Sequence, residues 1–396
     1  MRSDKWKTNH ACKCIASNVI TDGDSLRILL QKSIYSYGKA VKLFEDIKGD
    51  SMYHFHISMK AENAEYKVVF TCLDEKKVQL TRGYLKEKDR IVTPENTTVI
   101  EISVIGFAKN QEGVVSAENI ELDYIGPYEA RLVTVATVGV DYETDVPRTF
   151  EKNMTQNLER IDDIMREKKT DLVVLTECVY SRCVQCTVEE GALSLTDEPI
   201  RRFQAKAKEH GTYLAFSIRE KRDGRLYNTG VLIDRKGNIA GTYSKTHLTL
   251  SEYEEGLVPG EDIPVFQTDF GTVGIAICWD MFFPEMAKIY HLEGADIICY
   301  PTAGFDKERV DVRACDNGSF VITSAVHERC ESRIISPEGE TLGDASEKGY
   351  AIATIDLNKP YYLFWLSCPS YTTRKNMYLH ERRPDLYKRY NNITKL

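Results

Sequence analysis

Residues 271–305 constrain the fold more than any other stretch of this 396-residue chain. A short apolar run at 273–277 has the length of a buried strand, and Cys278 follows it at once. Pro284 then fits the first turn of a helix, where its missing N–H would have no partner anyway. A second apolar run, 297–300, has the pattern of another buried strand. The stretch therefore predicts a strand, a sharp turn that carries Cys278, a helix and a second strand.

Two interpretations of Cys278 remain open at this point. A thiol near the start of a helix is held on a rigid element, and the helix dipole favours its ionised, nucleophilic form. A cysteine in an apolar run can equally be a small buried hydrophobe, which is the commoner role. Other residues that a nucleophilic thiol would need must decide between the two.

The length and composition limit what kind of protein this is. A chain of 396 residues is long enough for two domains with a substantial core. The formal net charge of -8 and the lack of a long Lys/Arg run argue against nucleic acid as the main partner. No apolar stretch reaches the ~18 residues of a membrane helix, and the N-terminus lacks the apolar region of a signal peptide. We therefore expect a cytoplasmic protein without a membrane partner, with its cysteines reduced.

Residues 24–128 have the pattern of an all-β domain. Short segments with alternating or β-branched residues, separated by polar or glycine-containing turns, predict an antiparallel β-sandwich. The pattern resembles the jelly-roll modules of the carbohydrate-binding type, which implies sugar binding through exposed aromatic side chains. A structural or oligomerisation role is the alternative, because fold does not imply function. The available aromatic residues are Tyr35, Tyr37, Tyr53, Phe55, Tyr66 and Tyr84.

Beyond about residue 130 the pattern changes to strands that alternate with helices. Residues 132–138 and 171–176 have the composition of buried strands. Between them, residues 153–168 carry apolar side chains at the three- and four-residue spacing of an amphipathic helix. The alternation predicts a layered α/β domain. We therefore divide the chain into an N-terminal β-sandwich at 1–130, an α/β domain at 131–360 and a C-terminal extension at 361–396.

Two charged residues lie where a nucleophilic Cys278 would need them. Glu177 follows a buried strand and Lys245 follows a predicted hairpin, so both lie at strand ends. Chemistry in α/β sheets collects at the carboxyl ends of strands, so the three residues could converge. A desolvated carboxylate could take the thiol proton, and a fixed cation could stabilise an oxyanion. Taken singly, Glu177 could cap a loop and Lys245 could be a solvated surface charge.

Three motifs around these residues resemble those of the carbon–nitrogen hydrolase (nitrilase-like) superfamily. They are ERIDDIMREKKTDLVVLTE, which ends at Glu177, KTHLTLSEYEEGLVPGED, which begins at Lys245, and CWDMFFPE, which begins at Cys278. Two positions depart from the family's pattern. Thr176 stands where many members have proline, and Asp316 stands where the family's Arg-Ala-x-Glu-Asn segment has glutamate.

The resemblance covers about residues 131–357 and implies a four-layer α-β-β-α sandwich. The implied reaction is hydrolysis of a non-peptide C–N bond in a small amide, carbamoyl or nitrile compound. Glu177 would be the general base and Cys278 the nucleophile, while Lys245 and the backbone N–H of Trp279 would hold the oxyanion. Ammonia or an amine leaves, and water then resolves the thioacyl intermediate. No metal or organic cofactor is implied, and a homo-oligomer is expected.

The resemblance also implies a second glutamate beside Lys245. Glu252 is the first choice, and Glu254 and Glu255 are close enough to compete. The loops after Glu177, Lys245 and Tyr300 are expected to shape the substrate pocket. The pocket candidates are Tyr180, His247, Thr302 and Phe305.

The cysteines after Glu177 and the end of the chain each allow two interpretations. The C-x4-C-x2-C spacing of Cys178, Cys183 and Cys186 suggests a metal cluster, but no fourth ligand is evident, so a cysteine-rich loop near the pocket is the alternative. Residues 382–387 resemble the extension that family members pack across a subunit interface, and a frayed terminus is the alternative.

The sequence favours an amidase-like enzyme, with other functions left open. Asp280 follows Trp279 at a position where true nitrilases usually carry glutamate, which favours an amidase over a nitrilase. An acyltransferase would use the same three residues with an amine in place of water. An inactive sugar- or ligand-binding protein is a further alternative, and the presence of Glu177, Lys245 and Cys278 argues against it.

Overall fold

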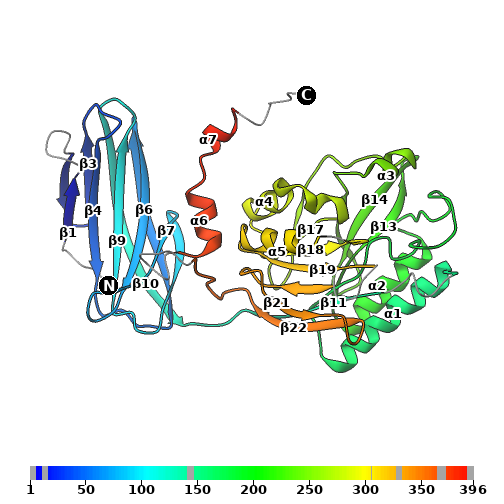
Figure 1. Ribbon diagram of the computed structural model, residues 1–396. Coiled ribbons are helices and arrows are strands. Elements are labelled where there is room, and N and C mark those ends of the chain that lie inside the picture. The colour runs from blue at the N-terminus through cyan, green and yellow to red at the C-terminus, as the bar shows by residue number, and fades with distance from the viewer. Residues whose placement is uncertain are drawn as a thin grey trace. The chain divides into compact units, whose positions relative to one another are not determined.

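The computed structural model describes residues 6–10, 17–140, 147–304, 306–326, 332–363 and 372–389. The chain forms two compact units, which Figure 1 lets the reader follow from blue to red. Unit 1 comprises Met1–Glu129 and Pro360–Leu396, and unit 2 comprises Ala130–Lys359. The segment expected as a separate extension is therefore grouped with the N-terminal unit. Among the described residues, no helix is both long and apolar enough to cross a bilayer.

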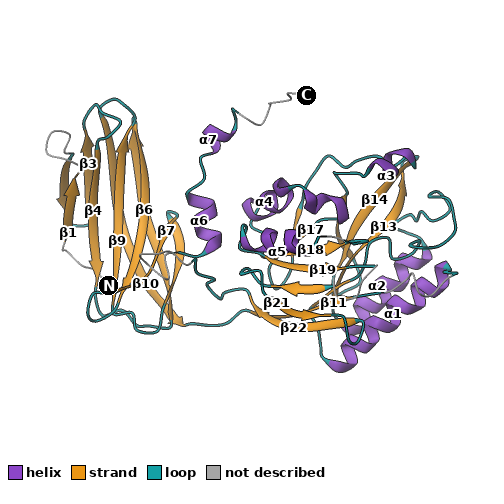
Figure 2. Cartoon of the chain, viewed as in Figure 1, coloured by secondary structure: helices purple, strands orange, loops and turns teal. Residues whose placement is uncertain are grey.

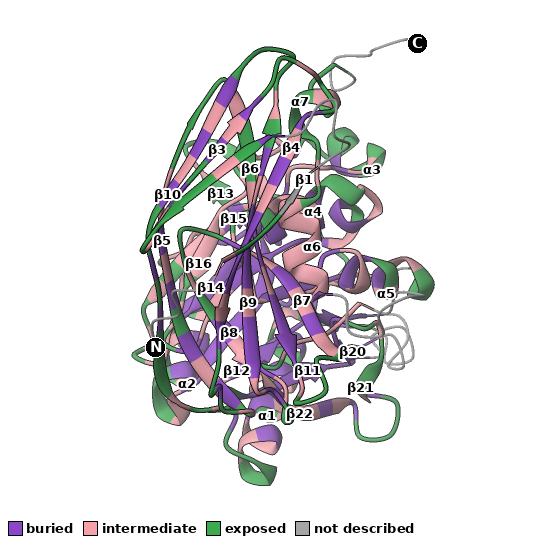
Figure 3. Cartoon of the chain, turned by 90° about the vertical axis from the view of Figure 1, so that its left-hand side faces the viewer, coloured by how far each residue is buried: buried purple, intermediate pink, exposed green. Residues whose placement is uncertain are grey.

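Unit 1 is a sandwich of two five-stranded antiparallel sheets (Figure 2), as the alternating segments predict. Burial alternates along many of its strands (Figure 3), because one face of each sheet packs on the shared core. The first sheet has the order β1 (Trp6–His10), β4 (Tyr37–Phe44), β9 (Val99–Ala108), β6 (Ala64–Leu73) and β7 (Gln79–Leu85). The second has the order β2 (Asn18–Asp22), β3 (Ser25–Leu30), β10 (Gly113–Pro127), β5 (Ser51–Glu62) and β8 (Lys88–Thr93).

Two of the aromatic residues considered for sugar binding belong to this core. Tyr53 is 1% exposed and Phe55 is 2% exposed, and both pack among the buried residues between the two sheets. Their place on β5 explains this, because they occupy its inward-facing alternate positions. Tyr53 and Phe55 are therefore not available to a ligand. Tyr35 and Tyr66, by contrast, are exposed.

The C-terminal part of unit 1 covers part of a sheet edge. α6 (Arg374–His380) lies against the edge strand β7 and is followed by α7 (Pro384–Tyr387). The Asn376 side chain accepts from the backbone N–H of Tyr84 at 2.7 Å and donates to its carbonyl at 2.8 Å. The Tyr84 ring also stacks on His380. Because an edge strand presents unpaired backbone groups, the amide of Asn376 replaces a missing neighbour at this point.

Unit 2 is built on two six-stranded sheets, each with three parallel strands at its centre. The outer strands of both sheets are antiparallel to their neighbours. The first sheet has the order β15 (Ile239–Ser244), β14 (Arg225–Ile233), β13 (Tyr213–Arg222), β12 (Leu172–Val174), β11 (Leu132–Val138) and β22 (Tyr350–Asp356). The second has the order β16 (Val265–Gln267), β17 (Thr272–Ile275), β18 (Ile297–Pro301), β19 (Phe320–Ser324), β20 (Arg333–Ile335) and β21 (Thr341–Asp344).

The two sheets of unit 2 pack face to face, and helices cover their outer sides (Figure 1). α1 (Phe150–Glu167) and α2 (Glu198–His210) lie on the first sheet, where their apolar faces join its strands in one core. α4 (Pro284–Leu292) and α5 (Lys307–Cys315) lie on the second. The predicted four-layer α-β-β-α sandwich is therefore confirmed.

The helix boundaries follow from the local sequence. The Thr149 hydroxyl accepts from the backbone N–H of Lys152 and caps α1, and Gly211 ends α2 in the left-handed region at φ 63. The helix expected from Pro284 begins there, and a 3-10 helix that the sequence analysis did not foresee, η2 (Cys278–Phe282), precedes it. Cys278 itself adopts φ 45, a conformation uncommon for a residue with a side chain.

Gly274 gives a test of the packing between β17 and α4. A Cβ at this position would lie 2.5 Å from the ring of Tyr290, which is fully buried and donates its hydroxyl to the Ile275 carbonyl. Because the ring has little room to move, Gly274→Ala should lower the free energy of unfolding by about 1–3 kcal/mol in urea denaturation.

Gly343→Ala is the matched control in the same sheet. Its Cβ would meet its nearest neighbour, Ala351, at 3.4 Å, an ordinary contact. We expect this change to alter the free energy of unfolding by less than about 0.5 kcal/mol. Equal losses in the two variants would contradict the packing argument.

Candidate active site

Glu177 lies just beyond the end of β12 and is 3% exposed. Its Oε1 accepts hydrogen bonds from Asn228 Nδ2 at 2.9 Å and from Lys245 Nζ at 3.4 Å. Arg182 Nη1 lies 3.9 Å from its Oε2. Burial alone would raise the pKa of Glu177, but the two cations and the Asn228 hydrogen bond outweigh it and lower the pKa below the ordinary value. Glu177 is therefore an ionised carboxylate that can accept a proton.

Lys245 directly follows β15 and is 1% exposed. Its ammonium donates to Glu252 Oε2 at 2.8 Å and to Glu177 Oε1 at 3.4 Å. Burial would lower the pKa of Lys245, but the charges of Glu177 and Glu252 raise it above the ordinary value. The ammonium is therefore a fixed positive charge inside the domain, held between two carboxylates.

Glu252 is the member of the three competing glutamates that contacts Lys245. It occupies the third position of α3 (Leu250–Glu254), where its Oε2 accepts from the Thr249 backbone N–H at 2.9 Å in a capping box. Its Oε1 accepts from Asn228 Nδ2 at 2.9 Å. Glu254 is exposed, and Glu255 pairs instead with Arg219 at 3.1 Å. The helix thus aims one glutamate inward and leaves the other two nearer the surface.

Cys278 opens η2, at the carboxyl end of the β17 segment of the second sheet. The Tyr300 hydroxyl donates to its backbone carbonyl at 2.7 Å and anchors the turn. Burial and the negative charge of Glu177 raise the pKa of the thiol to about 11, although Lys245 and hydrogen bonds from Ala303 and Thr302 act in the opposite direction. Cys278 is therefore a neutral thiol in the free protein.

This protonation state corrects the expectation of a thiolate stabilised by a helix dipole. The turn at Cys278 is a single short 3-10 helix, and α4 begins only at Pro284, so Cys278 does not itself lie in the first turn of α4. Burial and the nearby carboxylate then dominate the pKa of the thiol. Ionisation of Cys278 must instead come from transfer of its proton to a neighbouring base.

Asp280 connects the turn at Cys278 to the loop at Lys245. It is fully buried, and its Oδ2 accepts from the Ile277 backbone N–H at 2.9 Å and the Tyr243 hydroxyl at 2.8 Å. Its Oδ1 accepts from the His247 backbone N–H at 3.0 Å. These contacts fix the two segments to each other. From the sequence, Asp280 served only to weigh amidase against nitrilase chemistry, and its role as a connector was missed.

The remaining predicted residues fall into different surroundings. Thr302 is buried and hydrogen-bonds the Cys278 sulfur, whereas His247 is half-buried and stacks on Phe283. Trp279, 37% exposed, stacks on Phe282. Tyr180 stacks on Phe150 and packs against the core under α1 and α2, and Phe305 lies outside the described residues. Among the clustered cysteines, Cys178 is buried, Cys186 is half-buried and Cys183 is exposed.

Two contributors on the first sheet were missed by the sequence analysis. Asn228 on β14 donates to both Glu177 and Glu252, and Arg219 lies directly opposite it on β13. Arg219 Nη1 donates to Glu252 Oε1 at 3.4 Å. A signal for Asn228 was present, because it is a polar residue directly before the buried run 229–233. Its partners became identifiable only from the pairing of the strands.

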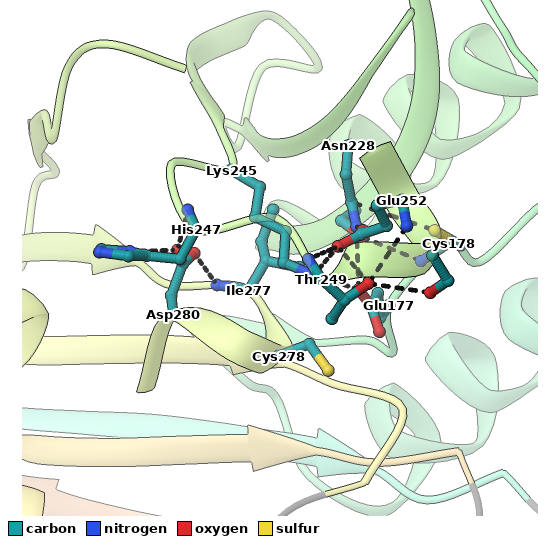
Figure 4. Close-up of polar contacts among 12 residues, drawn as sticks. Glu177, Cys178, Asn228, Lys245, His247, Thr249, Glu252, Ile277, Cys278 and Asp280 are labelled. Carbon is teal, nitrogen blue, oxygen red and sulfur yellow. Dashed lines mark hydrogen bonds and ion pairs between the residues drawn. The ribbon is translucent and has the colours of Figure 1, made fainter. Parts of the chain in front are cut away.

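The three residues predicted to be catalytic, Glu177, Lys245 and Cys278, therefore meet in one place. Figure 4 shows Glu177, Lys245 and Cys278 reaching the same region from three separate segments. A neutral thiol, an ionised carboxylate and a fixed ammonium lie close enough for each charge to act on the pKa of the thiol. This arrangement could remove a thiol proton and stabilise an oxyanion in a partly desolvated site.

Comparison with known proteins places this site in a family. The chain is 32% identical to a probable nitrilase of Schizosaccharomyces pombe over 43% of this chain and 65% of that protein, slightly less than two thirds of it. It is 32% identical to an omega-amidase of Xenopus tropicalis over 51% of this chain and 84% of the relative. It is 30% identical to an N-carbamoylputrescine amidase of Arabidopsis thaliana over 48% and 72% of the two chains.

A solved structure and a family model point to the same family as these relatives. The crystal structure of a carbon–nitrogen hydrolase from Helicobacter pylori covers 66% of this chain and 99% of its own, with a TM-score of 0.55 and 24% identity, which supports the fold. The family model for carbon–nitrogen hydrolases matches residues 134–360, more than half of the chain, and this span includes Glu177, Lys245 and Cys278. The chain belongs to the carbon–nitrogen hydrolase family.

Proposed function

We propose that this protein is a thiol-dependent amidase that hydrolyses a C–N bond of a small linear amide or carbamoyl amine. The observation that carries this proposal is the buried group of Glu177, Lys245 and Cys278, in which an ionised base and a fixed cation act on a neutral thiol. The relatives named as an omega-amidase and an N-carbamoylputrescine amidase support the choice of substrate class.

The first half of the reaction forms a covalent intermediate. The Cys278 sulfur attacks the carbonyl carbon of the substrate while its proton passes to Glu177. With its pKa raised to about 11, the thiol keeps its proton in the free protein, so Glu177 removes that proton after substrate binds. The Lys245 ammonium and the backbone N–H of Trp279 hold the negative oxygen. Glu177 then gives the proton to the leaving nitrogen, the C–N bond breaks as the tetrahedral intermediate collapses, and ammonia or an amine departs and leaves the thioester.

The second half releases the acid and restores the thiol. Glu177, again ionised, takes a proton from a water molecule, and the water oxygen attacks the thioester carbon. The second oxyanion occupies the same position as the first. When it collapses, the C–S bond breaks and the proton on Glu177 returns to the sulfur. Glu252 keeps Lys245 charged and in place throughout, because its carboxylate contacts the ammonium at 2.8 Å.

Nitrilase chemistry is the second candidate, because one relative is named a probable nitrilase. The same sulfur would attack a nitrile carbon, and water addition would give the acid and ammonia. An acyltransferase would replace that water with an amine. Product analysis separates the acyltransferase from the other two, since only an acyltransferase consumes an amine acceptor in step with the acyl donor, and turnover of amides or of nitriles separates the amidase from the nitrilase.

Replacing Cys278 tests the proposal directly. Ammonia release should be screened over short aliphatic amides, ω-amides, carbamoyl amines and nitriles, and we expect turnover of an amide or carbamoyl amine. Cys278→Ala should reduce that turnover by at least about a thousandfold, because the covalent route disappears. Circular dichroism should show an unchanged fold. Undiminished turnover by the variant would contradict the proposal, and turnover of nitriles alone would favour the nitrilase.

Glu252 and Glu254 form a matched pair of variants on one helix. Glu252→Gln removes a carboxylate that holds the Lys245 ammonium, so kcat should fall by about tenfold or more, as misplaced catalytic groups commonly cause. Glu254→Gln changes an exposed residue and should leave kcat within about twofold. Both variants need thermal unfolding measured alongside. A normal kcat for Glu252→Gln would remove Glu252 from the proposed mechanism.

The lowered pKa of Glu177 predicts the acidic limb of the pH profile. Catalysis requires the ionised carboxylate, so kcat/KM should stay level as pH falls and decline only below pH 4.5, the ordinary value for glutamate. The stability of the fold should change with pH in the same direction as kcat/KM. A carboxyl group with a lowered pKa in the folded state stabilises the fold at higher pH, and this stabilisation is lost as pH falls. An acidic limb well above pH 4.5 in a fully folded protein would contradict an ionised Glu177 as the base.

A further inference from the structure

Asn228 contacts both glutamates of the candidate active site through a single amino group. It lies on β14, is 1% exposed, and its Nδ2 donates to Glu177 Oε1 and to Glu252 Oε1, each at 2.9 Å (Figure 4). Its backbone carbonyl accepts from the Lys245 backbone N–H at 2.8 Å. One residue on a rigid strand thus sets the position of both carboxylates and of the lysine between them.

An asparagine amide suits this position because it is neutral and carries two hydrogens on one nitrogen. One hydrogen can go to each glutamate without adding a charge to the site. The amide oxygen then faces the Cys178 sulfur at 4.0 Å, and burial raises the pKa of that thiol, so Cys178 keeps the S–H that it donates. The inverted amide would direct its oxygen at two carboxylates, so the Cys178 contact and the two glutamates select the same orientation.

We propose that Asn228 is a positioning residue of the reaction, which gives one amide hydrogen to Glu177 and one to Glu252 and thereby holds both carboxylates in place around Lys245. The proposal rests on the proposed function, where Glu177 is the base. Two carboxylates that share one ammonium repel each other, and hydrogen bonds to their charged forms offset that repulsion. Without the hydrogen bond from Asn228, the charged form of Glu177 would be less favoured, so the pKa of Glu177 would rise.

Asn228→Asp and Asn228→Ala test this inference against a purely structural role. Asp has the shape of Asn, but an oxygen takes the place of the amide NH2, so the site gains a third carboxyl beside those of Glu177 and Glu252. Ala removes the side-chain contacts of Asn228 altogether. The acidic limb of kcat/KM should move to higher pH by about one unit in the Ala variant and further in the Asp variant. At neutral pH, kcat should fall by about tenfold or more.

Asn317→Ala is the matched control. Asn317 is a buried asparagine of the same unit, and its amino group donates to the Arg313 carbonyl at 2.8 Å. Its loss should lower the unfolding temperature without moving the acidic limb. An unmoved limb in both Asn228 variants, with a change in stability alone, would overturn the inference.

A second readout separates this inference from the proposed function. The rate of Cys278 alkylation by iodoacetamide should be followed against pH by mass spectrometry of the Cys278 peptide, with Cys278→Ala as the blank. The rate should rise with pH as Glu177 ionises and accepts the thiol proton, and this rise should lie at higher pH in the Asn228 variants. If no amide is turned over, the proposed function fails, yet a displaced alkylation profile still supports the role of Asn228. Identical profiles in the wild type and the variants would contradict it.

Discussion

The buried ammonium of Lys245 is the interaction on which the rest of the site depends. A charge removed from water is costly to bury unless its surroundings compensate it, and here two carboxylates do so. Each carboxylate needs further donors in turn, which Asn228, Arg219 and Thr249 supply. The network is therefore complete only when β13, β14, β15 and α3 are all in place. The charged site therefore depends on several elements of the folded sheet and not on one local segment.

The two sheets of unit 2 contribute different parts of the chemistry. The first sheet supplies the charged residues Glu177 and Lys245 and their partner Asn228, and the second supplies the thiol of Cys278. Asp280 joins them, because one buried carboxylate accepts hydrogen bonds from both the cysteine turn and the lysine loop. Face-to-face packing of the sheets therefore determines whether the thiol of Cys278 lies near Glu177 and Lys245, and a small shift between the layers would separate them.

The sequence was sufficient for the parts of this arrangement that repeat at regular spacing. Apolar runs located the strands that precede Glu177 and Cys278, and helical spacing located α1 to within a few residues. The sequence was insufficient for contacts that depend on how strands distant in the chain pair with each other. The contacts of Asn228 depend on the register between β14 and its neighbours, and the neutral thiol of Cys278 depends on burial and a carboxylate distant in sequence. Neither the contacts of Asn228 nor the protonation state of Cys278 can be predicted from the residues adjacent to them in the sequence.

Residues 360–396 belong to the same unit as residues 1–129, and this limits how the protein can be cut into separate domains. The carbon–nitrogen hydrolase domain is an insertion, since unit 1 contains residues from both sides of it. One domain can be inserted into another where the chain of the receiving domain is exposed, and the inserted domain is then connected to it by two chain segments. A truncation after residue 129 would remove Asn376 and leave the backbone N–H and carbonyl of Tyr84 without these two hydrogen bonds. An isolated hydrolase fragment must therefore be trimmed at both ends, and a sandwich fragment keeps the contact at Tyr84 only if it includes α6.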